Sequence, residues 1–181
     1  MNILVIGKSP DTLEKVLDGL RAEGLAALGT TEVEKASVDF NAKDLGLVAF
    51  GGGVELPVRD RLKSEFKRQN PDVILLDTFA PVAVQHIAAA LRGDRRFASR
   101  FEIAEREGSY IVRLDVLKEC HVRVEAYHLR DALHAEIIVE RHIPSGPFEA
   151  RIHKHKLARG VNMILVTLGG SEFYVHRVDR T

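Results

Sequence analysis

The chain has 181 residues, 45% of them hydrophobic and 29% charged, a composition typical of a globular protein with a buried core and not of a disordered chain. Lysine plus arginine and aspartate plus glutamate both number 26, so no net charge attracts nucleic acid or an anionic membrane surface. This length allows one large domain or two small ones, and the pattern along the chain has to decide between them.

The N-terminus and the single cysteine bear on location and reactivity. Residues 1–7 run directly into a helix start without a basic leader or a cleavage site, so the sequence predicts no export. No apolar run approaches the roughly 18 residues that a bilayer-crossing helix needs. We therefore expect a cytoplasmic protein without a membrane span. Cys120 excludes an intrachain disulfide and is interpreted as a packed thiol, not as a nucleophile.

The first half alternates short apolar runs with amphipathic segments, a pattern that predicts a parallel sheet covered by helices. The apolar runs expected to form strands are 3–6, 25–29, 45–50 and 73–76. The amphipathic segments expected to form helices are 10–23, 30–40, 55–69 and 80–92. Ser9 supplies a cap for the first of these helices, and Gly24 ends it.

The periodicity changes after Gly93. A polar, charged segment, 94–100, predicts a linker between an α/β domain at 1–93 and a second domain at 101–181. Alternation with period two then dominates, and the expected strands are 101–103, 110–114, 122–126, 135–139, 148–152, 163–165 and 173–175. Short strands of this number and spacing predict a seven-stranded antiparallel Ig-like β-sandwich.

Residues 1–92 resemble the receiver domain of bacterial response regulators, which has a doubly wound, flavodoxin-like fold. The resemblance rests on segments 2–6, 9–11, 50–55 and 70–77, which read NILVI, SPD, FGGGVE and NPDVILLD. It implies a truncated, receiver-like parallel sheet, because a fifth strand and helix are missing from the pattern.

The receiver resemblance also implies a site that has lost its chemistry. A working receiver holds a divalent cation on carboxylates after its first strand and phosphorylates an aspartate at the end of its third. Here those positions are Gly7, Lys8 and Gly51, and a lysine at a cation site repels the cation. Asp77 ends the fourth predicted strand, where a receiver has its switch hydroxyl residue. We therefore expect a pseudo-receiver that cannot be phosphorylated.

Glycines border the crevice at which open α/β sheets bind ligands. The candidate ligand-binding residues are Gly7, Lys8, Ser9, Gly51, Gly52 and Gly53. Three consecutive glycines before a helix leave amide groups pointing at a bound anion. However, the sequence has neither the dinucleotide-binding glycine motif nor a P-loop, so tight turns required by packing are the favoured interpretation.

Residues from about 110 to 178 are similar to small Ig-like domains of flagellar hook-cap proteins and of the C-termini of type-nine secretion cargo. The segments that carry this similarity are 122–129, 143–146 and 157–161, which read VRVEAYHL, IPSG and LARGV. Asn162 stands where those domains have an aromatic residue. The resemblance implies the Ig-like fold.

Seven of the eight histidines lie in the second half. His153 and His155 alternate on one predicted strand and are candidate metal ligands, with His142 as a third. Lys154 and Lys156 are interleaved with them, which favours a solvated polar face, so no metal or other cofactor is predicted.

The sequence as a whole favours a non-enzymatic protein-interaction or scaffold module in a bacterial cell. We expect its partner to be another protein or a second copy in a homodimer. We expect it to bind neither nucleic acid nor a membrane. The first alternative is a small-anion or nucleotide sensor that binds at the glycine crevice. A further one is a metal-dependent hydrolase or metal carrier that uses the histidines.

Overall fold

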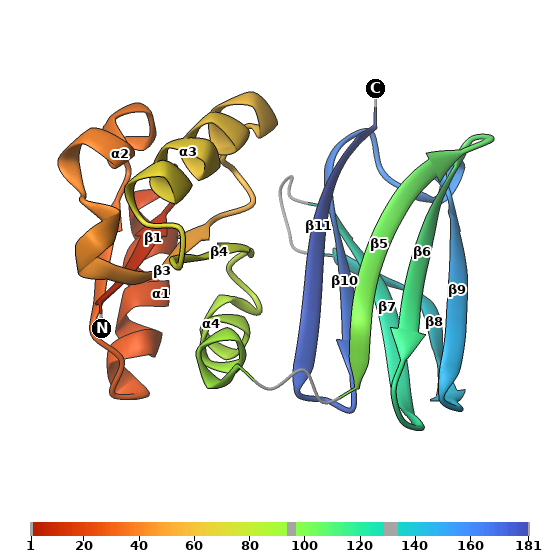
Figure 1. Cartoon of the computed structure of the whole chain (residues 1–181). Coiled ribbons are helices and arrows are strands. Elements are labelled where there is room, and N and C mark those ends of the chain that lie inside the picture. Colours follow the sequence, from red (N-terminus) through yellow and green to blue (C-terminus); the bar gives the residue numbers. More distant parts are fainter. Residues whose placement is uncertain (1, 94–96, 129–133, 181) are drawn as a thin grey trace. The chain divides into compact units, whose positions relative to one another are not determined.

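The computed structural model describes residues 2–93, 97–128 and 134–180, with the side chain of His134 excepted, and the chain divides into two compact units, Met1–Arg92 and Gly93–Thr181 (Figure 1). The expected helix-covered parallel sheet followed by antiparallel strands is confirmed. Of the predicted linker at 94–100, residues 94–96 lie outside the described residues. Ala98 already begins a strand, so the end of that segment is structured.

Unit 1 contains a parallel sheet with the strand order β2-β1-β3-β4. The strands are β1 (Asn2–Ile6), β2 (Ala27–Thr30), β3 (Leu45–Phe50) and β4 (Ile74–Asp77). The inner strands β1 and β3 pair along their whole length, in a register that places Ile6 beside Phe50. This arrangement brings the segments after β1 and β3 to the same edge of the sheet.

The helical segments of unit 1 are α1 (Pro10–Ala22), η1 (Val33–Lys35), α2 (Ala36–Asp39), η2 (Ala42–Asp44), α3 (Leu56–Gln69) and α4 (Ala83–Arg92). Ser9 caps α1 as expected, and Gly24 follows the helix with a φ of 73°, which favours glycine. The expected helix at 30–40 is instead a 3-10 turn followed by a single helical turn. η2 was not predicted from the sequence, and the Asn41 side chain caps it by accepting a hydrogen bond from the Lys43 amide.

Both faces of the sheet in unit 1 are buried, as expected for central parallel strands. On one face, Leu4, Val48 and Phe50 pack with residues of η1, α2, η2 and α3. On the other face, Val5 and Leu47 pack with residues of α1 and α4. The helices on both faces therefore hold the ends of β1 and β3 in place.

Unit 2 consists of antiparallel strands in two sheets, with the orders β11-β10-β7-β8 and β5-β6-β9 (Figure 1). The strands are β5 (Ala98–Arg106), β6 (Ser109–Val116), β7 (Cys120–His128), β8 (His134–Ile143), β9 (Gly146–His153), β10 (Gly160–Leu168) and β11 (Glu172–Arg180), with η3 (Lys154–Lys156) after β9. Each overlaps one predicted strand and is longer, because backbone pairing continues past the apolar positions that the sequence marks.

One apolar core lies between the two sheets of unit 2. Val124 and Ile164 from one sheet and Val112 and Ala150 from the other belong to the same buried cluster. Cys120 also belongs to it, and its side chain is buried. Inward residues alternate with outward ones most regularly along β9, where Phe148, Ala150 and Ile152 are buried and Glu149 and Arg151 are exposed.

No helix within the described part of the chain is both long and apolar enough to cross a membrane.

Candidate functional site

The structure brings the two halves of the predicted glycine crevice together. Gly7 follows β1 and Gly51 follows β3, and the Gly51 amide donates a hydrogen bond of 2.8 Å to the Ile6 carbonyl. A Cβ atom at Gly51 would lie 3.1 Å from that same oxygen, so this position needs a glycine for close backbone approach. A Cβ atom at Gly53 would meet only Lys8, at 3.8 Å, and one at Gly7 would meet nothing within 4 Å.

The polar side chains next to these glycines bind partners within the chain. The Lys8 ammonium donates to the Glu55 carboxylate over 2.6 Å, and Glu55 is the residue that precedes α3. The Ser9 hydroxyl caps α1 by accepting from the Thr12 amide, at 3.4 Å. Lys8 and Ser9, which were candidates for binding an anion, are thus both engaged within the chain, and the anion beside Lys8 is Glu55.

A buried arginine that was not predicted from the sequence lies beneath the glycine loop, residues 51–53. Arg59 on α3 is 1% exposed, and its Nη2 atom donates to the carbonyl oxygens of Gly51 and Val54, both at 3.0 Å. The signal was present in the sequence, because position 59 lies on the same helix face as Leu62 and Phe66. A charged residue within an apolar helix stripe needs a buried partner.

Asp77 at the end of β4 supplies that partner. Its Oδ1 atom lies 3.5 Å from Arg59 Nη1, and its Oδ2 atom accepts a hydrogen bond of 2.6 Å from Lys63. Asp77 lies in register with Phe50, the last residue of β3. Two cations therefore hold this carboxylate, so its role in the fold is that of a counter-ion.

The residue after Asp77 is a buried threonine. The Thr78 amide donates to the Phe50 carbonyl at 2.9 Å, which extends the β3–β4 pairing past the strand ends. The Thr78 hydroxyl lies 3.3 Å from Nδ1 of His86 on α4, and both side chains are buried. The hydroxyl at this strand end is thus also engaged internally.

The magnesium ion that the receiver resemblance implies does not fit this edge of the sheet. A hard divalent cation needs several oxygen ligands, but the positions after β1 are Gly7 and Lys8 and the position after β3 is Gly51. The Glu55 carboxylate is taken up by Lys8, and the Asp77 carboxylate by Arg59 and Lys63.

The structure separates the three histidines that were considered as metal ligands. The prediction that His153 and His155 lie on one strand is wrong, because β9 ends at His153 and His155 lies in η3. Their ring centroids are nevertheless 5.4 Å apart, near the end of the sheets where Arg180 pairs with Gly160. His142 lies near the C-terminal end of β8, where it pairs with His121, whereas the start of β8 pairs with His128. Among residues 2–93, 97–128 and 134–180, leaving out the His134 side chain, no three or more His, Cys, Asp or Glu side chains gather in a way that could hold a metal ion.

Cys120 has the environment of a structural thiol. Burial in the core of unit 2 raises the pKa of Cys120, and the nearby Glu172 carboxylate raises it further. The thiolate is the reactive form of cysteine, so both effects suppress its reactivity.

We expect Cys120 to react slowly with a thiol reagent in the folded protein, at a rate that rises sharply in denaturant. The measurement is the rate of absorbance change with an aromatic disulfide at pH 8, with and without urea. Equal rates in both conditions would show that the thiol is exposed.

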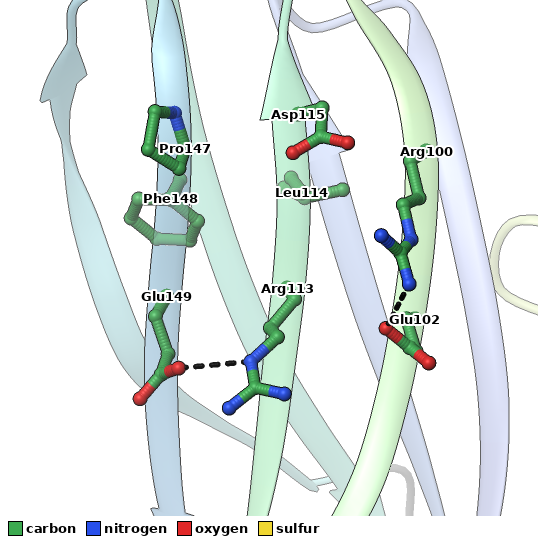
Figure 2. Close-up of a pocket in the computed structure, with 8 residues that line it drawn as sticks. All are labelled: Arg100, Glu102, Arg113, Leu114, Asp115, Pro147, Phe148 and Glu149. Atoms are coloured by element: carbon green, nitrogen blue, oxygen red, sulfur yellow. Dashed lines mark hydrogen bonds and ion pairs between the residues drawn. The ribbon is translucent and has the colours of Figure 1, made fainter.

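Unit 2 has a shallow depression of about 160 Å³ on the outer face of the sheet β5-β6-β9 (Figure 2). Its charged side chains pair across the strands, with Arg113 Nε 2.9 Å from Glu149 Oε2 and Arg100 Nη2 2.8 Å from Glu102 Oε2. The apolar side chains that line it, Leu114 and Phe148, belong to the core. The depression is thus bordered by ion pairs and offers no converging charge of one sign to a ligand.

Comparison with known proteins does not assign this chain to a family. No protein-family model matches the sequence, and no relative is found among curated proteins. Among solved structures, the chain is similar to a GH3 β-glucosidase from Bifidobacterium adolescentis with a TM-score of 0.34 and 11% identity, over 99% of this chain and 49% of that one. It is also similar to OgpA from Akkermansia muciniphila, with a TM-score of 0.32 and 7% identity, over 98% and 92% of the two chains. The chain spans about half the length of the β-glucosidases. These similarities are too weak to carry an argument about fold or function.

Proposed function

We propose that the chain is a non-enzymatic pseudo-receiver fused to an Ig-like β-sandwich, and that it acts as a protein-interaction or scaffold module. The order β2-β1-β3-β4 supports the first part, since flavodoxin-like sheets have the order 2-1-3-4-5. The described sheet of unit 1 has the first four of these strands in that order and differs by the absence of a fifth parallel strand beside β4. For the second part, naming β5 to β11 as strands A to G gives the sheets A-B-E and G-F-C-D. An Ig constant-type domain differs only in that its D strand pairs with E.

The observation that carries the proposal is the ion pair between Lys8 and Glu55. It places an ammonium group, 2.6 Å from its own carboxylate partner, where a receiver needs a free carboxylate for its cation. Aspartyl phosphorylation without such a cation leaves the charge of the transferred group unbalanced. The proposed role therefore depends on binding and not on phosphoryl transfer.

Exposed sheet edges support binding to a protein. The edge strand β8 carries Ile137, whose relative exposure is 48%, and an edge strand offers unpaired backbone groups to a further strand. A strand of a second copy or of another protein can pair with such an edge. Self-association can be tested without knowing the partner, so the experiment below measures it.

The test combines phosphorylation with sedimentation. The full chain is incubated with acetyl phosphate and Mg²⁺ and its intact mass is measured, with the expected result that no phosphoryl group is added. Sedimentation velocity over a range of concentrations is expected to show self-association that Ile137→Lys weakens. Val38→Lys, at a position of 84% exposure in unit 1, is the control and leaves self-association unchanged. A stable phosphoryl adduct would refute the pseudo-receiver proposal, and a monomer at every concentration would refute self-association.

A further inference from the structure

The β7–β8 pair carries two histidines directly opposite each other at one end. His121 on β7 is in register with His142 on β8, and their ring centroids are 5.4 Å apart with an interplanar angle of 72°. The adjacent pair, Cys120 and Ile143, belongs to the core of unit 2. Alternation along the strands therefore directs both imidazoles to the outer face. Both rings reach solvent, since the His121 side chain is 41% exposed and His142 is exposed as well.

We propose that His121 and His142 form an open binding site for Zn²⁺. A Zn–N bond is about 2.0 to 2.1 Å long, so two imidazoles bound to one tetrahedral ion have ring centroids about 5 Å apart. The observed 5.4 Å is close to this value. Neutral imidazole is a common ligand of zinc. Water fills the remaining coordination positions, as in other zinc sites that are not closed by protein ligands.

Little rearrangement separates this geometry from a bound state. The rings meet edge to face, so one imidazole has to turn about its side-chain bonds before a nitrogen of each points at the same ion. Exposed side chains make such turns within picoseconds to nanoseconds. The backbone already sets the spacing, since residues directly opposite on antiparallel strands have Cβ atoms about 4.5 to 5.5 Å apart.

The charge around the histidine pair suits a cation. Glu140 lies two residues before His142 on β8, and its Oε1 atom is 4.0 Å from His121 Nε2. The proposed protein ligands are the two imidazoles, and the carboxylate contributes its negative charge near them. The Arg123 guanidinium lies 4.0 Å from Glu140 but 3.1 Å from Glu125, so its closer ion pair is with Glu125.

A second histidine pair has the same spacing in a different charge environment. His153 and His155 also have centroids 5.4 Å apart, but their rings are nearly parallel and Nδ1 of His153 lies 3.1 Å from the Ser109 hydroxyl. Lys154 and Lys156 flank these rings along the chain, and although Lys154 pairs with Glu105, the charge of Lys156 repels a divalent ion. This pair is therefore the matched control for the proposed site.

A bound ion would join the edge strand β8 to β7, its neighbour in the sheet. The unfolded chain does not hold His121 and His142 at this spacing, so Zn²⁺ binds the folded state preferentially and raises the melting temperature. The proposed site thus links metal binding to the stability of the edge on which self-association is proposed, although it does not depend on that function.

The test is a titration of the full chain with Zn²⁺ after treatment with EDTA and dialysis, followed by calorimetry and by competition with a chromogenic zinc chelator. His121→Gln and His142→Gln are each expected to weaken binding at least about tenfold, because even residues that only support a metal ligand change affinity by 10- to 100-fold. His153→Gln is expected to leave the affinity unchanged. In NMR spectra of the wild type, Zn²⁺ is expected to shift the backbone amide signals around residues 121 and 142.

Both substituted histidines reach solvent, so the variants are expected to fold, and circular dichroism checks this. No binding by the wild type, or equal affinity in the wild type and the His121→Gln and His142→Gln variants, would overturn the proposal. Loss of binding in His153→Gln alone would overturn it as well, since the ion would then bind at the other pair.

Discussion

Arg59→Met is expected to lower the free energy of unfolding by about 2 to 4 kcal/mol. The substitution keeps an unbranched apolar stem in the helix but removes the donor to the part-buried Gly51 carbonyl and the buried Val54 carbonyl, and one cation beside Asp77. A buried acceptor left without its donor costs about 1 to 3 kcal/mol. The loss of stability is smaller than that caused by leaving a buried carboxylate without any cation, because Lys63 still pairs with Asp77 at 2.6 Å. Urea denaturation monitored by circular dichroism measures the change.

The matched control for this prediction is Arg61→Met on the same helix. The Arg61 side chain is 42% exposed and forms surface ion pairs with Glu34 and Glu65. Exposed ion pairs contribute about 0 to 1 kcal/mol, so this variant is expected to unfold close to the wild type. If Arg59→Met and Arg61→Met were equally stable, the hydrogen bonds under the glycine loop would not contribute to the fold as described.

The strands of unit 1 could be predicted from the sequence because both faces of a parallel sheet are buried. Residues 3–6 and 45–50 are continuous apolar runs, and such a run between turn signals leaves few alternatives. The segment at 30–40 was predicted less well. It folds as η1 and α2, and Val38 within it is 84% exposed, so the apolar spacing there does not mark one continuous buried face.

The proximity of the glycines after β1 and β3 could be predicted from the sequence, but the partners of the polar side chains near them could not. The rule that strand ends of a parallel sheet meet at one edge correctly placed Gly7 beside Gly51. Which partner each polar side chain chooses depends on contacts that are distant in sequence. Lys8 meets Glu55 and Arg59 meets Asp77, across 47 and 18 positions of the chain, and no local pattern encodes either pairing.

The histidine pairs also show that side-chain contacts between distant strands are not visible in the sequence. The alternation of His153 and His155 is visible in the sequence, whereas the pairing of His121 with His142 depends on the register of β7 and β8. That register is set by which residues face the core, since a shift by one position would turn Val122 and Val124 to solvent. A two-residue site across strands therefore becomes visible only when the strands are paired.

Glu172 connects the first residues of unit 2 to its last strand. It is 8% exposed, and its carboxylate accepts hydrogen bonds from the Phe97 amide at 2.7 Å, the Ala98 amide at 3.3 Å and the Tyr174 hydroxyl at 2.5 Å. Tyr174 also stacks on Phe101 of β5, with ring centroids 4.8 Å apart. These contacts join β5 of one sheet to β11 of the other along an edge where the two sheets share no backbone pairing.

Glu172→Ala is therefore expected to lower the free energy of unfolding by about 2 to 4 kcal/mol, since hydrogen bonds to a charged group contribute about 1.5 to 3 kcal/mol each and the freed amides regain only part of this from water. Glu102→Ala, on the exposed face of β5, is the control and is expected to change stability by no more than about 0.5 kcal/mol. Hydrogen exchange gives a local readout. The Phe97 and Ala98 amides should exchange faster in Glu172→Ala, while those in the middle of β6 and β10 follow only the global change in stability. Unchanged protection of the two amides would mean that the carboxylate does not hold the start of β5 against β11.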